Sequence, residues 1–303
     1  MKKLLLAAAV SALATGAAFA DTVRMGTEGA YPPYNFINDK GEVDGFEREL
    51  GDEICKRAAL DCTWVINEWD SIIPNLVSGN YDTIIAGMSV TAERDEVIDF
   101  TNEYIPASPS GYVGLADSSV DVSKGIIAAQ TNTIQAGYVA TSGGTLVEFA
   151  TPDETIAAVK NGEADAVLAD KDFLAPIVAE SNGMLAFVSD DVAIGGGVAM
   201  GMRESDTELK AKMNAAINAM KADGTLNTML SKWFKENTPQ WLFDFGAVVQ
   251  ATALPFYFAT RFQQHKAKHP CLNIALIRAT LKGSRGCLVT LPPPNTHRCI
   301  TAS

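Results

Sequence analysis

The run Leu76-Val-Ser-Gly-Asn-Tyr-Asp-Thr-Ile-Ile-Ala86 has an echo 83 residues further along the chain, in Val159-Lys-Asn-Gly-Glu-Ala-Asp-Ala-Val-Leu-Ala169. Each run is typical of a helix end, a glycine, an aspartate and then a buried strand, and glycine favours the left-handed conformation that commonly ends a helix. The repeat indicates two similar lobes that place polar groups at the carboxyl ends of strands, where open α/β sheets bind ligands. Coincidence between two ordinary turns is the alternative.

Strand-like and helix-like runs alternate throughout residues 21–241. This alternation predicts an α/β fold of mostly parallel sheets covered by helices. Two helix starts carry the capping-box pattern, Thr151-Pro-Asp-Glu154 and Ser205-Asp-Thr-Glu208. The strand-like runs are Val23–Met25, Thr63–Ile66, Thr83–Ala86, Gly111–Leu115, Ile126–Gln130, Leu146–Phe149 and Ala166–Ala169.

The charge is distributed unevenly along the 303 residues, whose net charge is −12. Residues 1–20 carry +2, residues 242–303 carry +6, and residues 21–241 carry −20. An acidic chain argues against a nucleic-acid binder, which needs Lys and Arg to meet the phosphates. The composition, 47% hydrophobic and 20% charged, excludes disorder, collagen-like repeats and a multi-span membrane protein.

The first twenty residues have the pattern of an export signal. Lys2 and Lys3 precede an apolar run from Leu4 to Ala14, and Ala18-Phe19-Ala20 supplies small residues before a cleavage site. A membrane anchor is the less favoured alternative, because the apolar stretch is short for a span of about 20 residues. We expect a mature protein that begins at Asp21, outside the cytoplasm.

Export makes disulfides possible, and residues 21–241 contain two cysteines. Cys55 lies near the end of a helix-like run in which Phe46, Leu50 and Ile54 recur every four residues, and Cys62 opens the next strand. A helix end and a following strand start can approach to disulfide distance. We therefore expect a Cys55–Cys62 bridge rather than two free buried thiols.

Aromatic residues follow two of the expected strands. Tyr31-Pro-Pro-Tyr-Asn-Phe36 comes after the first strand, and Trp69 comes after the strand that Cys62 opens. Two aromatic rings at strand ends could sandwich a flat or aliphatic ligand. For a single aromatic residue, ordinary packing is the stronger alternative.

Charged and polar groups follow other strands. Arg94 could pair with a carboxylate. A surface ion pair with Glu93, Asp95 or Glu96 is a fair rival. Residues 130–133 open a helix, whose exposed N–H groups favour an anion. Asp170 ends a strand and could receive an ammonium group. Together these groups predict a receptor for an α-amino acid that closes between two lobes.

Several motifs resemble one known family. They are Gly26-Thr-Glu-Gly-Ala-Tyr-Pro-Pro-Tyr-Asn-Phe36, Gly45-Phe-Glu, the run from Trp69 through Ile73-Pro-Asn-Leu76, Ser89-Val-Thr-Ala-Glu-Arg94 and Ala222-Asp-Gly-Thr225. Over about residues 22–241 the chain resembles the periplasmic polar-amino-acid-binding proteins of ABC importers (solute-binding protein family 3), in particular the lysine/arginine/ornithine and histidine binders. The spacing of Cys55 and Cys62 also resembles a small disulfide loop of that subgroup.

The resemblance implies a role for each group that meets the amino-acid backbone of the ligand. Arg94 would bind the α-carboxylate, helped by the backbone N–H groups of Ser89 and Thr133. The α-ammonium would be received by Asp170, by the Ser89 hydroxyl and by the carbonyl of Gly87.

The resemblance also implies that Tyr31 and Trp69 flank the ligand side chain, and that Glu28 meets its distal cationic group. Two departures from the family pattern concern the preference for the ligand side chain. Ala86-Gly87 stands where a Ser-Ser pair is common, and Asn132 replaces a Thr or Ser.

The fold that the resemblance implies is the two-lobed type II periplasmic-binding-protein fold. Ile105-Pro-Ala-Ser108 would be the first strand that crosses between the lobes, and the glycine-rich region 195–201 the second. Lobe 1 would then comprise residues 21–106 plus 204–241, and lobe 2 residues 107–203. Closure would be a hinge motion around the ligand.

The last 62 residues, 242–303, do not share this pattern and hold all three histidines and three of the five cysteines. His265 and His269 have a helical i, i+4 spacing near Cys271, but no further ligand pair supports a metal site. A membrane span over residues 242–260 is disfavoured by Asp244 and Pro255. We expect an appended extension that the fold does not need.

The expected function is extracytoplasmic capture of a polar amino acid, with a cationic one favoured, for delivery to an ABC permease. We expect no catalysis, no metal, no cofactor, a monomer and a periplasmic location. The alternative is a dehydratase-like enzyme of the same fold that acts on a prephenate-type acid. An enzyme needs a tuned acid or base, and residues 21–241 contain no histidine. A sensor module is a third and weaker possibility.

Overall fold

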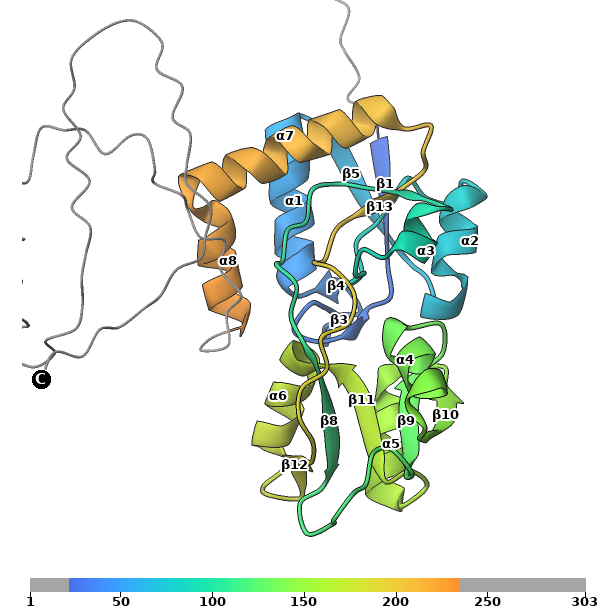
Figure 1. Ribbon diagram of the computed structural model, residues 1–303. Coiled ribbons are helices and arrows are strands. Elements are labelled where there is room, and N and C mark those ends of the chain that lie inside the picture. Colours follow the sequence, from blue (N-terminus) through green and yellow to red (C-terminus); the bar gives the residue numbers. More distant parts are fainter. Residues whose placement is uncertain (1–21, 235–303) are drawn as a thin grey trace, which may run out of the picture. The chain divides into compact units, whose positions relative to one another are not determined.

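The computed structural model describes residues 22–234 (Figure 1). The expected export signal, the remainder of the similar region up to Trp241 and the tail 242–303 lie outside the described residues. Within residues 22–234 the chain forms two α/β lobes, each built on a five-stranded sheet. None of the helices in this range has the length and apolar character that a membrane crossing requires.

The first sheet has the strand order β5-β1-β6-β13-β7. Strand β1 is parallel to β5 and to β6, whereas β13 is antiparallel to β6 and to β7. The five strands are β1 (Thr22–Thr27), β5 (Asp61–Ile66), β6 (Thr83–Ile84), β7 (Asp99–Phe100) and β13 (Gly201–Met202). A small antiparallel sheet follows β1 and comprises β2 (Ala30–Tyr31), β3 (Asn35–Ile37) and β4 (Val43–Asp44).

The helices of the first lobe come from both ends of the described chain. The long helix α1 packs against α7 and α8, and its buried Phe46, Leu50 and Ile54 follow the predicted four-residue spacing. These side chains form one core cluster with apolar residues of α7 and α8. The helices are α1 (Phe46–Ala58), the 3-10 turn η1 (Trp69–Ser71), α2 (Ile72–Val77), α3 (Ala92–Asp95), α7 (Thr207–Asp223) and α8 (Thr225–Phe234).

The second sheet has the order β10-β9-β11-β8-β12. Strand β9 is parallel to β10 and β11, whereas β8 is antiparallel to β11 and β12. Its strands are β8 (Ser110–Leu115), β9 (Ile126–Gln130), β10 (Thr145–Phe149), β11 (Ala166–Asp170) and β12 (Leu185–Phe187), and its helices are α4 (Ile134–Ser142), α5 (Pro152–Asn161) and α6 (Lys171–Glu180).

The expectation of mostly parallel sheets was wrong, because each sheet has two parallel and two antiparallel pairings. The strands next to the crossings explain the difference. Strand β8 follows the first crossing and β13 follows the return crossing, as Figure 1 shows. A strand that arrives from the other lobe starts at the edge where its neighbours end, so it runs antiparallel to them.

Two segments connect the sheets, one between β7 and β8 and one between β12 and β13. They pair with each other at Ile105 and Val198, where the Val198 N–H donates to the Ile105 carbonyl at 2.9 Å. The predicted lobe 2, residues 107–203, includes β13. In the structure β13 pairs within the sheet of the first lobe.

The repeated sequence forms the same corner in both lobes. Gly79 and Gly162 both adopt positive φ after a helix, at 81° and 75°. The carboxylate of Asp82 then accepts the backbone N–H of Arg24 on β1 at 3.0 Å, and Asp165 accepts that of Ile126 on β9 at 2.7 Å. Each aspartate therefore ties its corner to the first parallel strand of its lobe.

The capping predictions had different outcomes. Thr151 and Glu154 form the complete capping box at the start of α5. The box predicted at Ser205 was wrong, because α7 begins at Thr207 with Asp206 as its N-cap. The Ser205 hydroxyl instead donates to the Asp206 carboxylate at 3.0 Å. The second pattern is therefore one residue out of register with the helix.

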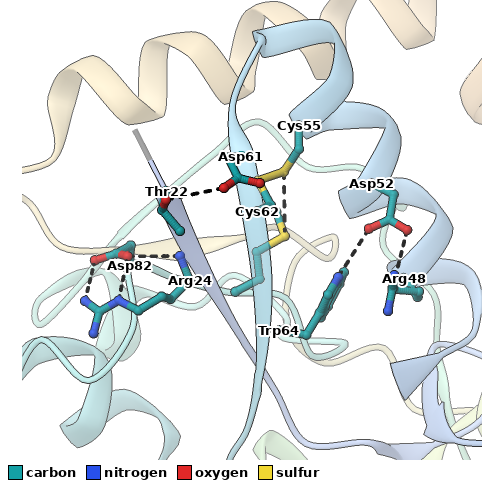
Figure 2. The surroundings of a disulfide bond; sticks show 10 residues. Thr22, Arg24, Arg48, Asp52, Cys55, Asp61, Cys62, Trp64 and Asp82 are labelled. Carbon is teal, nitrogen blue, oxygen red and sulfur yellow. Dashed lines mark hydrogen bonds and ion pairs between the residues drawn. A yellow bond between two sulfur atoms is a disulfide. The ribbon is translucent and has the colours of Figure 1, made fainter. Parts of the chain in front are cut away.

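The predicted disulfide is present and joins the end of α1 to the start of β5 (Figure 2). The Cα atoms of Cys55 and Cys62 are 6.2 Å apart. Cys55 is buried in the core cluster of the first lobe and its sulfur lies 3.9 Å from that of Met25. The bridge thus fastens α1 to the amino-terminal end of the strand.

Candidate ligand-binding site

A cavity is lined by residues from the carboxyl ends of strands in both lobes. The structure brings all eight predicted ligand-binding residues into its lining. The full lining comprises Glu28, Tyr31, Trp69, Ala86, Gly87, Ser89, Arg94, Gln130, Thr133, Ile134, Gln135, Pro152, Thr155, Leu168, Ala169 and Asp170.

Arg94 supplies a positive charge to the cavity from the short helix α3. The Thr91 hydroxyl caps this helix by accepting the Arg94 backbone N–H at 3.2 Å. The guanidinium donates from Nη1 to the carbonyl of Ser89 at 2.8 Å, and its Cζ lies 5.3 Å from the centre of the Trp69 ring. Burial lowers the pKa of Arg94 to about 10, against the opposing effect of Asp170, so the side chain stays cationic at neutral pH.

Asp170 supplies a negative charge at the end of β11. Its Oδ2 accepts the Tyr31 hydroxyl at 2.9 Å, and its Oδ1 accepts an N–H of Gln135 at 2.8 Å. Burial raises the pKa of Asp170 to about 6, assisted by Asp172 and opposed by Arg94 and by both hydrogen bonds. The carboxyl group therefore titrates just below neutral pH.

Glu28 supplies a second carboxyl group, directly after β1. Its Oε1 accepts an N–H of Gln130 at 2.6 Å, and the same Gln130 nitrogen donates to the carbonyl of Ala150 at 3.0 Å. Burial raises the pKa of Glu28 to about 7, with a further contribution from Asp153 and an opposing one from Gln130. A nearby cation would favour its ionised form.

Two aromatic side chains from the first lobe complete the cavity wall. The Tyr31 ring stacks on that of Phe173, with centroids 4.1 Å apart and planes inclined by 11°. Trp69 is buried and donates from its indole nitrogen to the carbonyl of Asn132 at 3.3 Å. Both rings therefore also contact the second lobe, and ordinary packing accounts for part of their burial.

The turn before α4 contains one of the departures noted in the sequence. Asn132 has a positive φ of 57°, and its side-chain amide donates to Asp70. The Thr133 hydroxyl donates to the Gln130 carbonyl at 2.7 Å and accepts the Ala136 N–H at 3.1 Å. Since this hydroxyl caps the helix, the group that Thr133 can offer to an anion is its backbone N–H.

Gly87 and Ser89 lie on the loop between β6 and α3. Gly87 has a positive φ of 62°, and its backbone N–H donates to Glu47 at 2.6 Å. Ser89 is buried and forms an isolated bridge with Val198 of the return crossing. The loop is thus hydrogen-bonded to Glu47 of α1 and paired with Val198 of the return crossing.

Sequence reasoning missed Gln135, which donates to Asp170 and, at 3.0 Å, to the hydroxyl of Ser110. Its position one residue inside α4 is a weak signal, because many helices begin with a polar residue. Gln130 was placed at a strand end but given no contact with Glu28. Both contacts depend on neighbours 25 to 102 residues away in the sequence.

These features define a solute-binding protein of two α/β lobes, with a cavity that carries one cationic side chain, two carboxyl groups and two aromatic rings. Such a set is complementary to a zwitterion with a further positive charge. The chain belongs to the bacterial extracellular solute-binding proteins, family 3, which it matches over residues 23–236.

Curated relatives of the chain are periplasmic amino-acid-binding proteins. The putative ABC transporter arginine-binding protein 2 of Escherichia coli is 31% identical, over 78% of this chain and 100% of that protein. The lysine/arginine/ornithine-binding periplasmic protein of the same species is 32% identical, over 78% of this chain and 98% of that protein.

Solved structures share the fold. A periplasmic His/Glu/Gln/Arg/opine family-binding protein from Silicibacter pomeroyi, in complex with lysine, is 73% identical with a TM-score of 0.71, over 72% of this chain and 100% of that one. An ancestral amino-acid-binding protein, a precursor of cyclohexadienyl dehydratase, is 27% identical with a TM-score of 0.63, over 71% and 95%. The two-lobed type II fold predicted from the sequence is confirmed.

Proposed function

We propose that this protein captures an amino acid with a cationic side chain, L-lysine foremost, and delivers it to the membrane permease of an ABC importer. The observation that carries this proposal is the charge arrangement of the cavity, with Arg94 opposed by two carboxyl groups, Asp170 and Glu28. The lysine complex of the 73% identical relative supports the choice of ligand.

In the proposed complex the ligand carboxylate pairs with Arg94 and with the backbone N–H groups of Ser89 and Thr133. The ligand ammonium is received by Asp170, by the Ser89 hydroxyl and by the Gly87 carbonyl. Such charge-assisted hydrogen bonds are shorter and stronger than neutral ones. They recognise the backbone of any amino acid, so they do not by themselves select the side chain.

Selection of the side chain falls to Glu28, Tyr31 and Trp69. Glu28 lies on the opposite lobe from Asp170 and is oriented by Gln130. A distal ammonium or guanidinium group that pairs with Glu28 would offset the burial that raises its pKa. The aromatic rings of Tyr31 and Trp69 would cover the aliphatic part of the ligand side chain.

We propose binding without catalysis. The alternative is a dehydratase of prephenate-type acids, and one structurally similar protein is the precursor of such a dehydratase. Glu28 and Asp170 are the acidic groups of the cavity lining, and each accepts a protein hydrogen bond that suits a fixed charge partner. Residues 22–234 contain no histidine and no cysteine outside the disulfide.

We further propose a periplasmic monomer that is exported by residues 1–20 and closes about the two crossing segments. Lobe 1 would comprise the first sheet with α1, α2, α3, α7 and α8, and lobe 2 the second sheet with α4, α5 and α6. The hydrogen bond between Ile105 and Val198 keeps the two crossings together and supports a common hinge.

Isothermal titration of the wild-type protein with L-lysine, L-arginine, L-ornithine, L-histidine and L-glutamine tests the proposal. We expect saturable binding that is tightest for the cationic ligands. Arg94→Ala should abolish binding of every amino acid, because the ligand carboxylate would lose its charged partner. Arg48→Ala is the matched control, since Arg48 pairs with Asp52 on the surface of α1. Turnover of prephenate without binding of any amino acid would contradict the proposal.

A further inference from the structure

One buried carboxylate lies beneath the loops that line the cavity. Glu47, the second residue of α1, is fully buried. Its Oε1 accepts the backbone N–H of Gly87 at 2.6 Å and the hydroxyl of Tyr104, and its Oε2 accepts the side-chain amide of Asn35 at 2.7 Å. Each of these partners is a donor, so the glutamate acts as an acceptor for three separate segments.

The first segment is the loop that carries Glu28 and Tyr31. Asn35 is fully buried and uses both ends of its amide, because its Oδ1 accepts the backbone N–H of Gly29 at 2.7 Å while its nitrogen donates to Glu47. Glu47 therefore reaches the backbone beside Glu28 through a single side chain.

The second segment is the loop that carries Gly87 and Ser89, which Glu47 contacts directly through the Gly87 N–H. The third is the first crossing, since Tyr104 precedes Ile105, the residue that bridges to Val198. One carboxylate thus connects two ligand-facing loops and the connection between the lobes.

The start of α1 is built to hold Glu47 in this place. The backbone N–H groups of Phe46 and Glu47 donate to the carbonyls of Pro33 and Tyr34, at 2.9 and 2.8 Å. Gly45 permits this approach, because a Cβ atom there would lie 2.6 Å from the Tyr34 carbonyl oxygen and its φ is 114°. The aromatic loop, residues 31–36, is therefore hydrogen-bonded to the start of α1, the helix that carries Glu47.

Burial raises the pKa of Glu47, while the hydrogen bonds from Tyr104, Gly87 and Asn35 lower it. An ionised carboxylate can satisfy all three donors at once. A neutral amide in its place would turn an NH₂ group toward at least one of them, leaving a buried donor without an acceptor.

We propose that Glu47 is a positioning residue that holds the Gly29 and Gly87 loops in the conformation that binds the ligand. The inference rests on the proposed function, because the loops carry the residues assigned there to the ligand. It goes beyond that function by giving a role to a side chain that does not line the cavity. If both loops are already ordered in the free protein, less conformational entropy is lost when the ligand binds.

The test uses ¹⁵N-labelled Glu47→Gln in the full chain. In the free protein we expect the amide signals of Gly87 and Gly29 to move and their hydrogen exchange to accelerate. The dissociation constant for L-lysine should rise by roughly tenfold or more, the change expected if the binding conformation of the loops becomes about a tenth as populated in the free protein. The matched control is Leu50→Ala, which removes a core side chain from the same helix. It should lower the melting temperature while leaving both amide signals and the affinity unchanged.

Asn35→Ala is a second variant that keeps the result decisive if Glu47→Gln does not fold. This variant removes only the hydrogen bonds that connect Glu47 to Gly29. The amide signal of Gly29 should therefore move and the lysine affinity should fall, while the Gly87 amide keeps its hydrogen bond to Glu47. Unchanged Gly29 and Gly87 amides in the free variants would overturn the inference. An affinity for lysine that matches the wild-type value in Glu47→Gln, or that falls as much in Leu50→Ala as in Glu47→Gln, would overturn it as well. If the wild-type protein does not bind lysine, the proposed function fails, and the amide signals still decide whether Glu47 holds the loops.

Discussion

Burial moves the pKa values of the three charged groups of the cavity toward neutrality. The pKa of Arg94 falls to about 10, and those of Asp170 and Glu28 rise to about 6 and about 7. Each shift means that the protein alone does not fully compensate the charge of that residue. A ligand with one carboxylate and two cationic groups would supply the missing partners, which is why a dibasic amino acid suits the site.

The two carboxyl groups predict a pH-dependent affinity. Glu28 binds a cation only in its ionised form, so the affinity for L-lysine should rise with pH and level off above about pH 7. Between pH 8 and pH 6 we expect a loss of about tenfold from the protonation of Glu28 and about twofold more from that of Asp170. Titration calorimetry at several pH values in one buffer series measures this profile.

Glu28→Gln provides the control for that profile. At pH 8 the variant should lose roughly tenfold to a hundredfold in lysine affinity and much less in L-glutamine affinity, because glutamine carries no distal charge. Its remaining pH dependence should follow Asp170 and level off near pH 6. Equal losses for lysine and glutamine would contradict the role proposed for Glu28.

At the scale of elements, the two ends of helix α1 have different tasks. Its amino-terminal end holds the aromatic loop and carries Glu47, while its carboxyl-terminal end carries Cys55. The apolar face between these ends packs on α7 and α8. A change near Cys55 should therefore affect stability more than binding.

The disulfide tests this separation. Replacing both Cys55 and Cys62 by alanine should lower the free energy of unfolding by about 2 to 3 kcal/mol, the chain-entropy value for a short loop. The lysine affinity should stay the same, because Cys62 lies at the amino-terminal end of β5 and the ligand site lies at the carboxyl ends of the strands. Urea denaturation and calorimetry on the same sample measure both quantities, and a parallel loss of affinity would refute the separation.

At the scale of the whole molecule, ligand-facing side chains also connect the two lobes. Tyr31 donates to Asp170, Gln130 donates to Glu28, and the indole nitrogen of Trp69 donates to the backbone carbonyl of Asn132. A ligand that pairs with Asp170 and Glu28 would compete with or extend these contacts. Closure of the lobes and recognition of the ligand thus use the same polar atoms.

The tail 242–303 gives a prediction at this scale. The 73% identical structure is covered in full by 72% of this chain, and the family match ends at residue 236. A chain shortened to end at Trp241 should therefore keep the melting temperature and the lysine affinity of the full protein. Differential scanning calorimetry and titration of both forms test this, and a loss of folding or affinity on shortening would show that the tail is required.

Much of the site could be predicted from the sequence. The eight residues predicted to bind the ligand all line one cavity, and the expected disulfide and the repeated corner are present. Motifs such as Ser89-Val-Thr-Ala-Glu-Arg94 place several functional groups in one short stretch. Gln135 and Glu47 were not predicted, because their hydrogen-bond partners lie in distant segments.

The sequence by itself determined the α/β class and the cysteine pair from local periodicity and spacing. Its resemblance to a known family added the two-lobed fold and the candidate ligand residues. Only the tertiary structure decided the direction of β8 and β13, the start of α7 and the network around Glu47. These features arise where chain segments from different lobes or distant elements meet. Hydrogen bonds between such segments depend on spatial approach, which the local pattern of residues does not encode.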